Sequence, residues 1–203
     1  MTRLFTRRRD TTSRGQSLVE MALLLPLLML IVLGTLEFGF VFDHHLSLEY
    51  ATREGARTGS AIVNGGGPVG CPGTATTTEV DSSIIAAVER VLDSPDSPID
   101  VADVTEIRIY KADVNGNQTG SQMNRWTPGA GPSVDGVSLS FARTGPEGWA
   151  SCSRSNILPN AESIGVSLQY TYTYQTPLTA LLGWATLTMS DRTVMQFNPT
   201  NDN

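Results

Sequence analysis

The chain has 203 residues, of which 40% are hydrophobic and 17% charged, and its net charge is −6. This length suits one ordinary domain with an additional segment. The low charged fraction, the 19 glycines and the 11 prolines indicate many turns rather than a helical bundle. Nucleic-acid binders need a basic surface to displace counterions from phosphate, so we expect no nucleic-acid partner.

Charge is distributed unevenly along the chain. Residues 1–15 carry five arginines and one aspartate, a net charge of +4, and the remainder carries −10. Residues 21–36 contain no charged residue, and Glu37 is the only interruption before the apolar segment ends at Phe42. About 20 apolar residues with a rise of about 1.5 Å each match the hydrocarbon core of a bilayer. We therefore expect a transmembrane segment at about residues 18–42, with Glu37 solvated near its second interface.

The flanks of this segment predict its orientation. Arginines precede it, whereas Asp43 and Glu49 follow it, so the positive-inside rule places the N-terminus in the cytoplasm and the body outside. A cleaved secretory signal is the alternative, because it also has a basic region before an apolar one. The apolar segment is too long for a signal peptide, and no small-x-small cleavage site follows Phe42.

A glycine and a carboxylate flank the start of the apolar segment. Gly15 lies immediately before it, and Glu20 follows five residues later. A carboxylate is unfavourable there, by about 2.5 to 3.5 kcal/mol at a helix centre and less near the interface, so we expect Glu20 to have a partner. A cut after Gly15 creates an α-amino group on Gln16, one helical turn from Glu20, on the same chain or a neighbour.

Two segments resemble one family. Gly15 followed by Glu20 resembles the processing site of type IV prepilins, and residues 14–26 resemble the TadE-like proteins of tight-adherence, Flp-type pilus systems. Residues 51–57 are similar to the Ala-x-Arg-Glu-Gly-Ala-Arg segment of the same family. The matching positions are Ala51, Arg53, Glu54, Gly55, Ala56 and Arg57. Met21 follows Glu20 where Flp-type major pilins carry tyrosine, which favours a minor pilin or pseudopilin.

The resemblance implies a membrane-inserted structural subunit for assembly of a tight-adherence pilus. A prepilin-type peptidase would cut between Gly15 and Gln16, and Glu20 would set the register of assembling helices. The expected partners are the bacterial cytoplasmic (inner) membrane, the peptidase, other pilin-like subunits and the pilus assembly machinery. The resemblance implies no enzymatic activity, cofactor, metal or small-molecule substrate. It leaves open whether the protein enters the filament.

The predicted architecture is α+β, with a long N-terminal transmembrane helix and a pilin-like domain built on a mainly antiparallel sheet. We expect a basic leader at residues 1–15, a long helix at 16–63 and an extracytoplasmic globular domain at 64–203. Pro26 lies inside the helix and predicts a kink. Ala51, Gly55 and Gly59 share one helix face, which indicates close packing, on the chain's own domain in preference to a neighbouring subunit.

The globular part shows one more helical pattern and several strand patterns. Apolar residues from Val80 to Leu92 lie on one helix face before Pro95. Alternation predicts strands over residues 104–114, 137–141, 164–172 and 187–195.

Cys71 and Cys152 are the only cysteines. Both fall on the predicted outer side of the membrane, where cysteines oxidise, so we expect a disulfide that closes a long loop and stabilises the fold by roughly 4 kcal/mol. Two unpaired buried thiols are the alternative.

Other candidate chemistry is weak. His44 and His45 point about 100° apart on a helix and are expected to be ordinary interfacial histidines. The segment from Asp113 to Gly120 resembles part of a calcium loop, but Asn124 stands where a bidentate glutamate is needed, and an Asn-Gly hairpin turn is the alternative. No nucleophile elbow or phosphate-binding loop is present in the sequence.

Two further functions stay open at this point. One is an uncleaved single-pass anchor that displays an extracellular binding domain. The other is an exported hydrolase tethered by its signal anchor. Neither explains why a carboxylate lies where Glu20 does.

Overall fold

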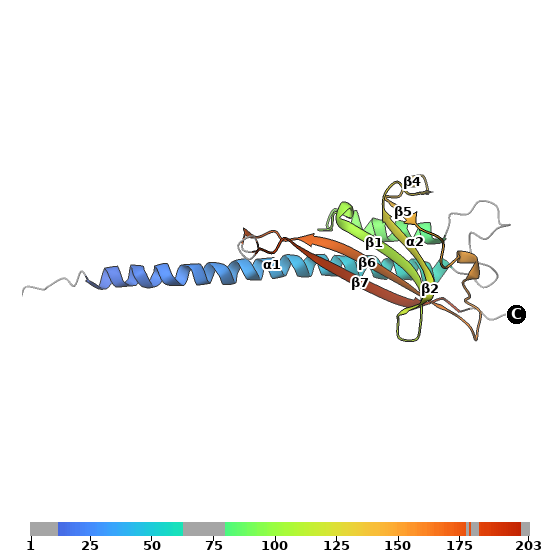
Figure 1. The fold of residues 1–203 in the computed structure, drawn as a ribbon, viewed down its shortest axis with the longest axis horizontal. Coiled ribbons are helices and arrows are strands. Elements are labelled where there is room, and N and C mark those ends of the chain that lie inside the picture. The colour runs from blue at the N-terminus through green and yellow to red at the C-terminus, as the bar shows by residue number, and fades with distance from the viewer. Residues whose placement is uncertain (1–11, 63–79, 178, 180–182, 200–203) are drawn as a thin grey trace, which may run out of the picture. The chain divides into compact units, whose positions relative to one another are not determined.

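The computed structural model describes residues 12–62, 80–177, 179 and 183–199. A long helix, α1 (Thr12–Ile62), is followed by a second helix, α2 (Val80–Leu92), and then by strands (Figure 1). The strands of the main sheet all pair in antiparallel fashion. The predicted α+β class, with a long apolar N-terminal helix, is confirmed.

Helix α1 forms because its sequence is rich in leucine, a strong helix former, with Pro26 as its one proline. Its 51 residues correspond to a length of about 77 Å at the usual rise. Hydroxyl groups within it donate to carbonyls one turn earlier, as Thr35 does to Ile31 at 2.9 Å. These bonds satisfy polar groups that would otherwise face an apolar surrounding.

The chain divides into two compact units. The first combines the described part of Met1–Phe40 with Tyr174–Ala185, and the second combines Val41–Thr173 with Thr186–Asn203. Helix α1 therefore contributes its apolar segment to one unit and its outer segment to the other. The segment between the last two strands belongs with the apolar part of the helix.

The main sheet of the second unit has the order β5-β2-β1-β6-β7. Its strands are β1 (Val104–Ala112), β2 (Gln118–Pro128), β5 (Phe141–Thr144), β6 (Ser163–Thr173) and β7 (Thr186–Gln196). A small hairpin of β3 (Ser133–Val134) and β4 (Val137–Ser138) stands apart from it. Short 3-10 turns, η1 (Val101–Asp103) and η2 (Ser151–Ser153), connect these elements.

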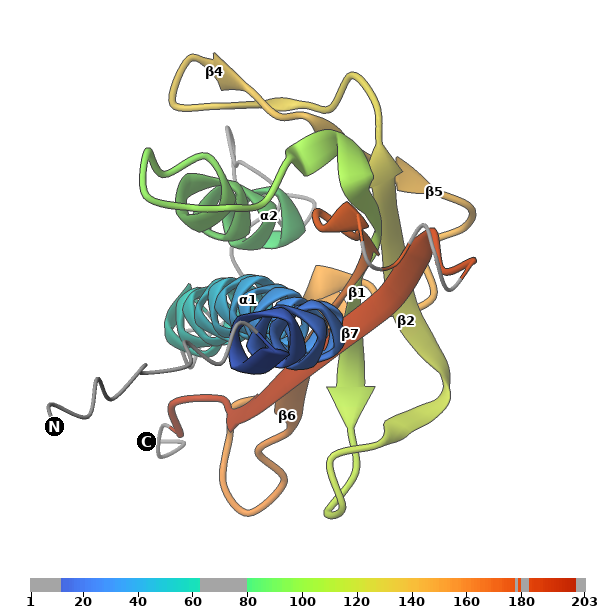
Figure 2. The ribbon, with the colours of Figure 1, turned by 90° about the vertical axis from the view of Figure 1, so that its left-hand side faces the viewer.

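The core of the second unit lies between the sheet and the two helices. Within this unit, α2 and the segment of α1 from Val41 onward lie on the same side of the sheet (Figure 2). Alternate residues of the two central strands, such as Ile107 and Val166, face these helices and are fully buried. Helix α2 buries Ile84, Val88 and neighbouring residues against them, as its apolar face predicts.

Two strand predictions need correction. Strand β2, second in the order, was not predicted, because its inward face carries Asn124 beside Trp126 and so breaks the apolar alternation. Residues 137–141 were predicted as one strand. In the structure Val137 lies in the small hairpin, whereas Phe141 begins β5 of the main sheet.

Candidate assembly and membrane-anchoring site

The head of the apolar helix carries the predicted cleavage and assembly residues. The Gly15–Gln16 bond lies inside α1, within its first turn. A Cβ atom added to Gly15 would meet nothing within 4 Å. The Gln16 amide donates to Glu20 Oε1 at 3.2 Å, and the pair is exposed. The structure thus brings Gln16 and Glu20 together through the side-chain amide, before any cut creates an α-amine.

Beyond this head, α1 exposes its apolar side chains. Every large hydrophobic residue from Leu23 to Ile31 is at least 43% exposed. Among the described residues, α1 is the one helix long and apolar enough to cross a membrane. Such exposure is unfavourable in water and favourable in lipid, so this segment is a membrane anchor.

The far end of the apolar segment departs from expectation. Glu37 was predicted to be solvated near the second interface, but the structure buries it to 6% exposure. Its Oε1 accepts the backbone N–H of Gln175 at 3.1 Å, and its Oε2 accepts that of Thr176 at 2.7 Å. Two N–H donors replace the water that this carboxylate would otherwise need.

The motif at residues 51–57 has two faces. Ala51, Gly55 and Ala56 are buried, whereas the charged residues point outward and pair along the helix. Arg57 donates to both oxygens of Glu54, at 2.8 and 2.6 Å. The hydrogen bonds from Arg57 lower the pKa of Glu54, and the same contact raises the pKa of Arg57.

Arg53, the remaining charged residue of the motif, pairs with Glu49 one turn earlier. The charged face of the motif therefore consists of local, exposed ion pairs.

The glycines on the buried face allow close packing on the chain's own domain. A Cβ atom at Gly55 would lie 2.6 Å from Val88 Cγ2 and 3.3 Å from Val166 Cγ1. A Cβ atom at Gly59 would lie 2.7 Å from Ile164 Cδ1. Helix α2 and strand β6 thus approach α1 at these positions. The small residues serve this internal packing, as the sequence analysis favoured.

Sequence reasoning missed the polar contact beside this motif. The Thr52 hydroxyl is buried, donates to Asp191 Oδ2 at 2.5 Å and lies 3.0 Å from Thr193 Oγ1. Asp191 and Thr193 belong to β7, so this contact joins the outer segment of α1 to the last strand. A threonine inside the motif was the only sequence signal, and it named no partner.

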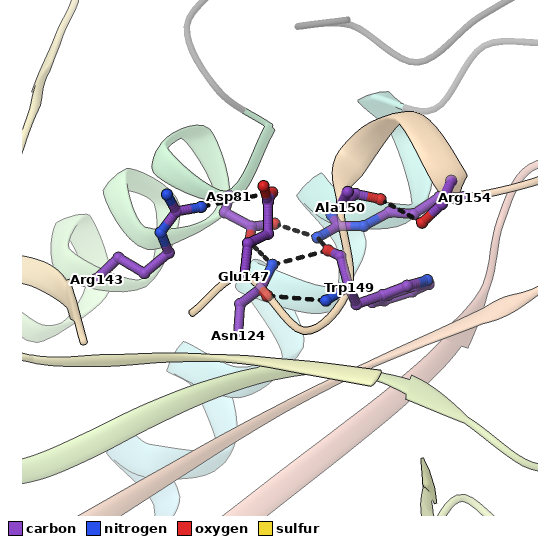
Figure 3. A network of polar contacts seen from close by, with 8 residues as sticks. Asp81, Asn124, Arg143, Glu147, Trp149, Ala150 and Arg154 are labelled. Carbon is purple, nitrogen blue, oxygen red and sulfur yellow. Dashed lines mark hydrogen bonds and ion pairs between the residues drawn. The ribbon is translucent and has the colours of Figure 1, made fainter. Parts of the chain in front are cut away.

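A buried polar network was also missed (Figure 3). Arg154 lies 2.6 Å from Asp81, and both side chains are fully buried. The Asn124 amide donates to Asp81 Oδ2 at 2.6 Å and to the Trp149 carbonyl at 2.8 Å. The guanidinium also lies over the Trp149 ring, 4.3 Å from its centroid. This network joins the start of α2, strand β2 and the turn η2.

One cysteine of the predicted disulfide, Cys152, lies in the turn η2. Cys71 lies outside the described residues, and of Cys152 only the backbone, within η2, is described. The Cys71–Cys152 bridge therefore stays a prediction.

The remaining candidates have structural explanations. Asp113 Oδ1 accepts the backbone N–H groups of Asn115 and Asn117, each at 2.8 Å, and Gly116 has φ +78°. This is the hairpin turn between β1 and β2. His44 is buried, and its ring meets the Tyr172 ring edge-on at 4.8 Å.

Among the described residues, no group of three or more His, Cys, Asp or Glu side chains is arranged to hold a metal ion. A groove on the sheet face turned away from α2 is lined by polar residues of β1, β6 and β7. At its edge Glu106 pairs with Arg108 and, at 2.9 Å, with Arg125. Arg192, which also lines the groove, donates to Asn117 Oδ1 at 3.2 Å, and Asp191 accepts the Thr52 hydroxyl.

Comparison with known proteins identifies the N-terminal part of the chain. No curated protein and no solved structure matches the chain. One family model matches a segment that includes the head of the apolar helix and the whole motif that packs on the sheet. Residues 15–57 match the family model described as TadE-like protein, which confirms the family resemblance stated for this chain.

Proposed function

We propose that this protein is a TadE-like minor pilin or pseudopilin, a membrane-inserted structural subunit for assembly of a tight-adherence, Flp-type pilus. The observation that carries the proposal is the match over residues 15–57, which joins Gly15, the proposed cleavage-site glycine, with Glu20, the membrane helix and the packed motif in one segment. The family is related to pili and structural, so the proposal includes no catalytic activity, cofactor or small-molecule substrate.

The glycines of α1 fall into two groups, those that the chain's own packing requires and those that it does not. Gly55 and Gly59 are explained by contacts within the chain. A Cβ atom at Gly15, Gly34 or Gly39 would meet nothing within 4 Å, so packing in this chain does not require glycine there. Gly15 fits a peptidase that must hold an extended backbone beside the membrane. Glycine also weakens the first turn of α1, by up to about 1 kcal/mol relative to alanine, which eases local unwinding.

In this proposal the cut changes the partner of Glu20. Removal of residues 1–15 gives Gln16 an α-amino group, a stronger partner for a carboxylate than the amide that now contacts it at 3.2 Å. An amine on a neighbouring chain would fix the vertical register of two apolar helices. The peptidase and other pilin-like subunits are therefore the proposed partners, with the N-terminus inside and the globular domain outside the cytoplasmic membrane.

The decisive experiment is N-terminal sequencing of the protein isolated from membranes. Wild type should begin at Gln16, and Gly15→Val should keep residues 1–15. Gly34→Val is the matched control, because its site is equally open and lies in the same helix; it should be cut normally. A wild-type chain that keeps its leader in the presence of the peptidase would contradict the proposal and support the uncleaved anchor.

A further inference from the structure

A carboxylate of the membrane helix holds the loop between β6 and β7. Glu37 accepts the backbone N–H groups of Gln175 and Thr176 with its two oxygens, at 3.1 and 2.7 Å. The loop is also closed on itself, since the Trp184 N–H donates to the Thr179 carbonyl at 2.9 Å. The described residues of this loop, 174–177, 179 and 183–185, belong to the same compact unit as the apolar helix.

The position of Glu37 along the helix sets the level of this loop. Glu20 and Glu37 are 17 residues apart in the sequence, which corresponds to about 25 Å along a helix. The uncharged, exposed segment between them is close to the thickness of a hydrocarbon core. If Glu20 lies at one interface, Glu37 lies near the other. The loop that Glu37 holds is then at the height of the lipid headgroups.

The composition of the loop suits that level. Residues 174–185 contain no charged residue. Trp184 is 59% exposed, and its ring lies 6.4 Å from that of Tyr174, centroid to centroid. The other two tryptophans, Trp126 and Trp149, are each 1% exposed. Tryptophan and tyrosine concentrate at membrane interfaces, where an apolar ring and a polar edge are both satisfied.

We infer that this loop is a second membrane contact, in which Trp184 and Tyr174 insert among the lipid headgroups beside the helix and Glu37 holds them there. The occupant of this surface is the bilayer, because the surface continues the lipid-facing helix within one compact unit. The inference requires membrane anchoring but not a pilus. Its failure would leave the proposed function standing.

Tryptophan fluorescence tests the contact directly in the full-length chain, reconstituted in phosphatidylcholine–phosphatidylglycerol vesicles. The Trp184 signal is the emission of wild type minus that of Trp184→Phe. Lipids brominated near the top of the acyl chain should quench it, and aqueous iodide should not. Quenching by iodide alone would place Trp184 in water and overturn the inference. Quenching by neither would assign the surface to another protein copy and overturn it as well.

A second pair of variants tests the role of Glu37. Glu37→Ala removes both acceptors, so iodide should gain access to Trp184 and bromolipid quenching should fall. Glu20→Ala, at the other end of the apolar segment, is the matched control and should leave both signals unchanged. The buried Trp126 and Trp149 report whether the rest of the chain is folded, since both should stay shielded from iodide. Unchanged Trp184 quenching in folded Glu37→Ala would overturn the holding role.

Discussion

Asp81 and Arg154 form a fully buried ion pair, 2.6 Å apart, that joins the first turn of α2 to the turn η2. Asn124 completes the pair by donating to Asp81 from strand β2. A charge left without its partner in such a place keeps its desolvation penalty, so the two residues are strongly interdependent.

This interdependence gives the first prediction. Arg154→Met should lower the free energy of unfolding of the globular domain by about 3 to 5 kcal/mol, because Asp81 then stays buried without a counter-ion. Arg143→Met is the control, since Arg143 lies 3.4 Å from Glu147 in a pair that is about one-third exposed; its effect should be below about 1 kcal/mol. Denaturant unfolding followed by circular dichroism measures both. Equal effects would contradict the prediction.

The second prediction concerns the close contacts of α1. Gly55→Ala should destabilise the domain by about 1 to 3 kcal/mol, because its Cβ atom would lie 2.6 Å from Cγ2 of Val88, whose β-branched side chain is stiff, and 3.3 Å from Val166 Cγ1. Gly39→Ala should not, because nothing lies within 4 Å of its Cβ position. Thermal unfolding of the two variants in the same detergent compares them. A similar midpoint for both would show that the domain relaxes around the added methyl group.

Interactions between residues close in the sequence were predictable, whereas those between distant residues were not. The apolar helix and its motif were predictable because their signals, absence of charge and small residues at helical spacing, are local. The partners of Glu37 were not, because they are backbone N–H groups 138 and 139 residues away. A backbone group carries no signature in the sequence. The Asp81–Arg154 pair was missed for a related reason, since only the folded sheet brings α2 and η2 together.

The third prediction is a pH dependence that comes from Glu89. Its Oε1 accepts the Ser140 N–H at 2.8 Å, but burial raises its pKa above the ordinary value. A raised pKa in the folded state means that folding binds protons, so this residue's contribution to stability falls as pH rises from the ordinary pKa through the raised one.

Glu89→Gln removes this titration. The free energy of unfolding of the variant minus that of wild type should therefore be more positive at pH 7 than at pH 4. Taking this difference cancels any constant effect of the amide on packing. Urea unfolding at several pH values measures it, and a difference that does not change with pH would contradict the assignment.

The fourth prediction concerns the cysteines. With the body outside the membrane, Cys71 and Cys152 should be joined, so alkylation of non-reduced protein from intact cells should label neither. Both should react after reductant. Labelling before reduction would remove the predicted bridge and would also argue against the outer location of the body.

The last prediction separates the two possible partners of Glu20. In the uncut chain the Gln16 side-chain amide contacts Glu20, whereas the proposed assembly uses the α-amine that cleavage creates on Gln16 of a neighbour. Glu20→Ala should therefore be cut and inserted normally but lose crosslinking to partner pilin subunits. Gln16→Ala keeps the α-amine and loses only the amide, so it should crosslink like wild type. Loss of crosslinking in both variants would identify the amide as the partner, and crosslinking by Glu20→Ala at the wild-type level would exclude the register role altogether.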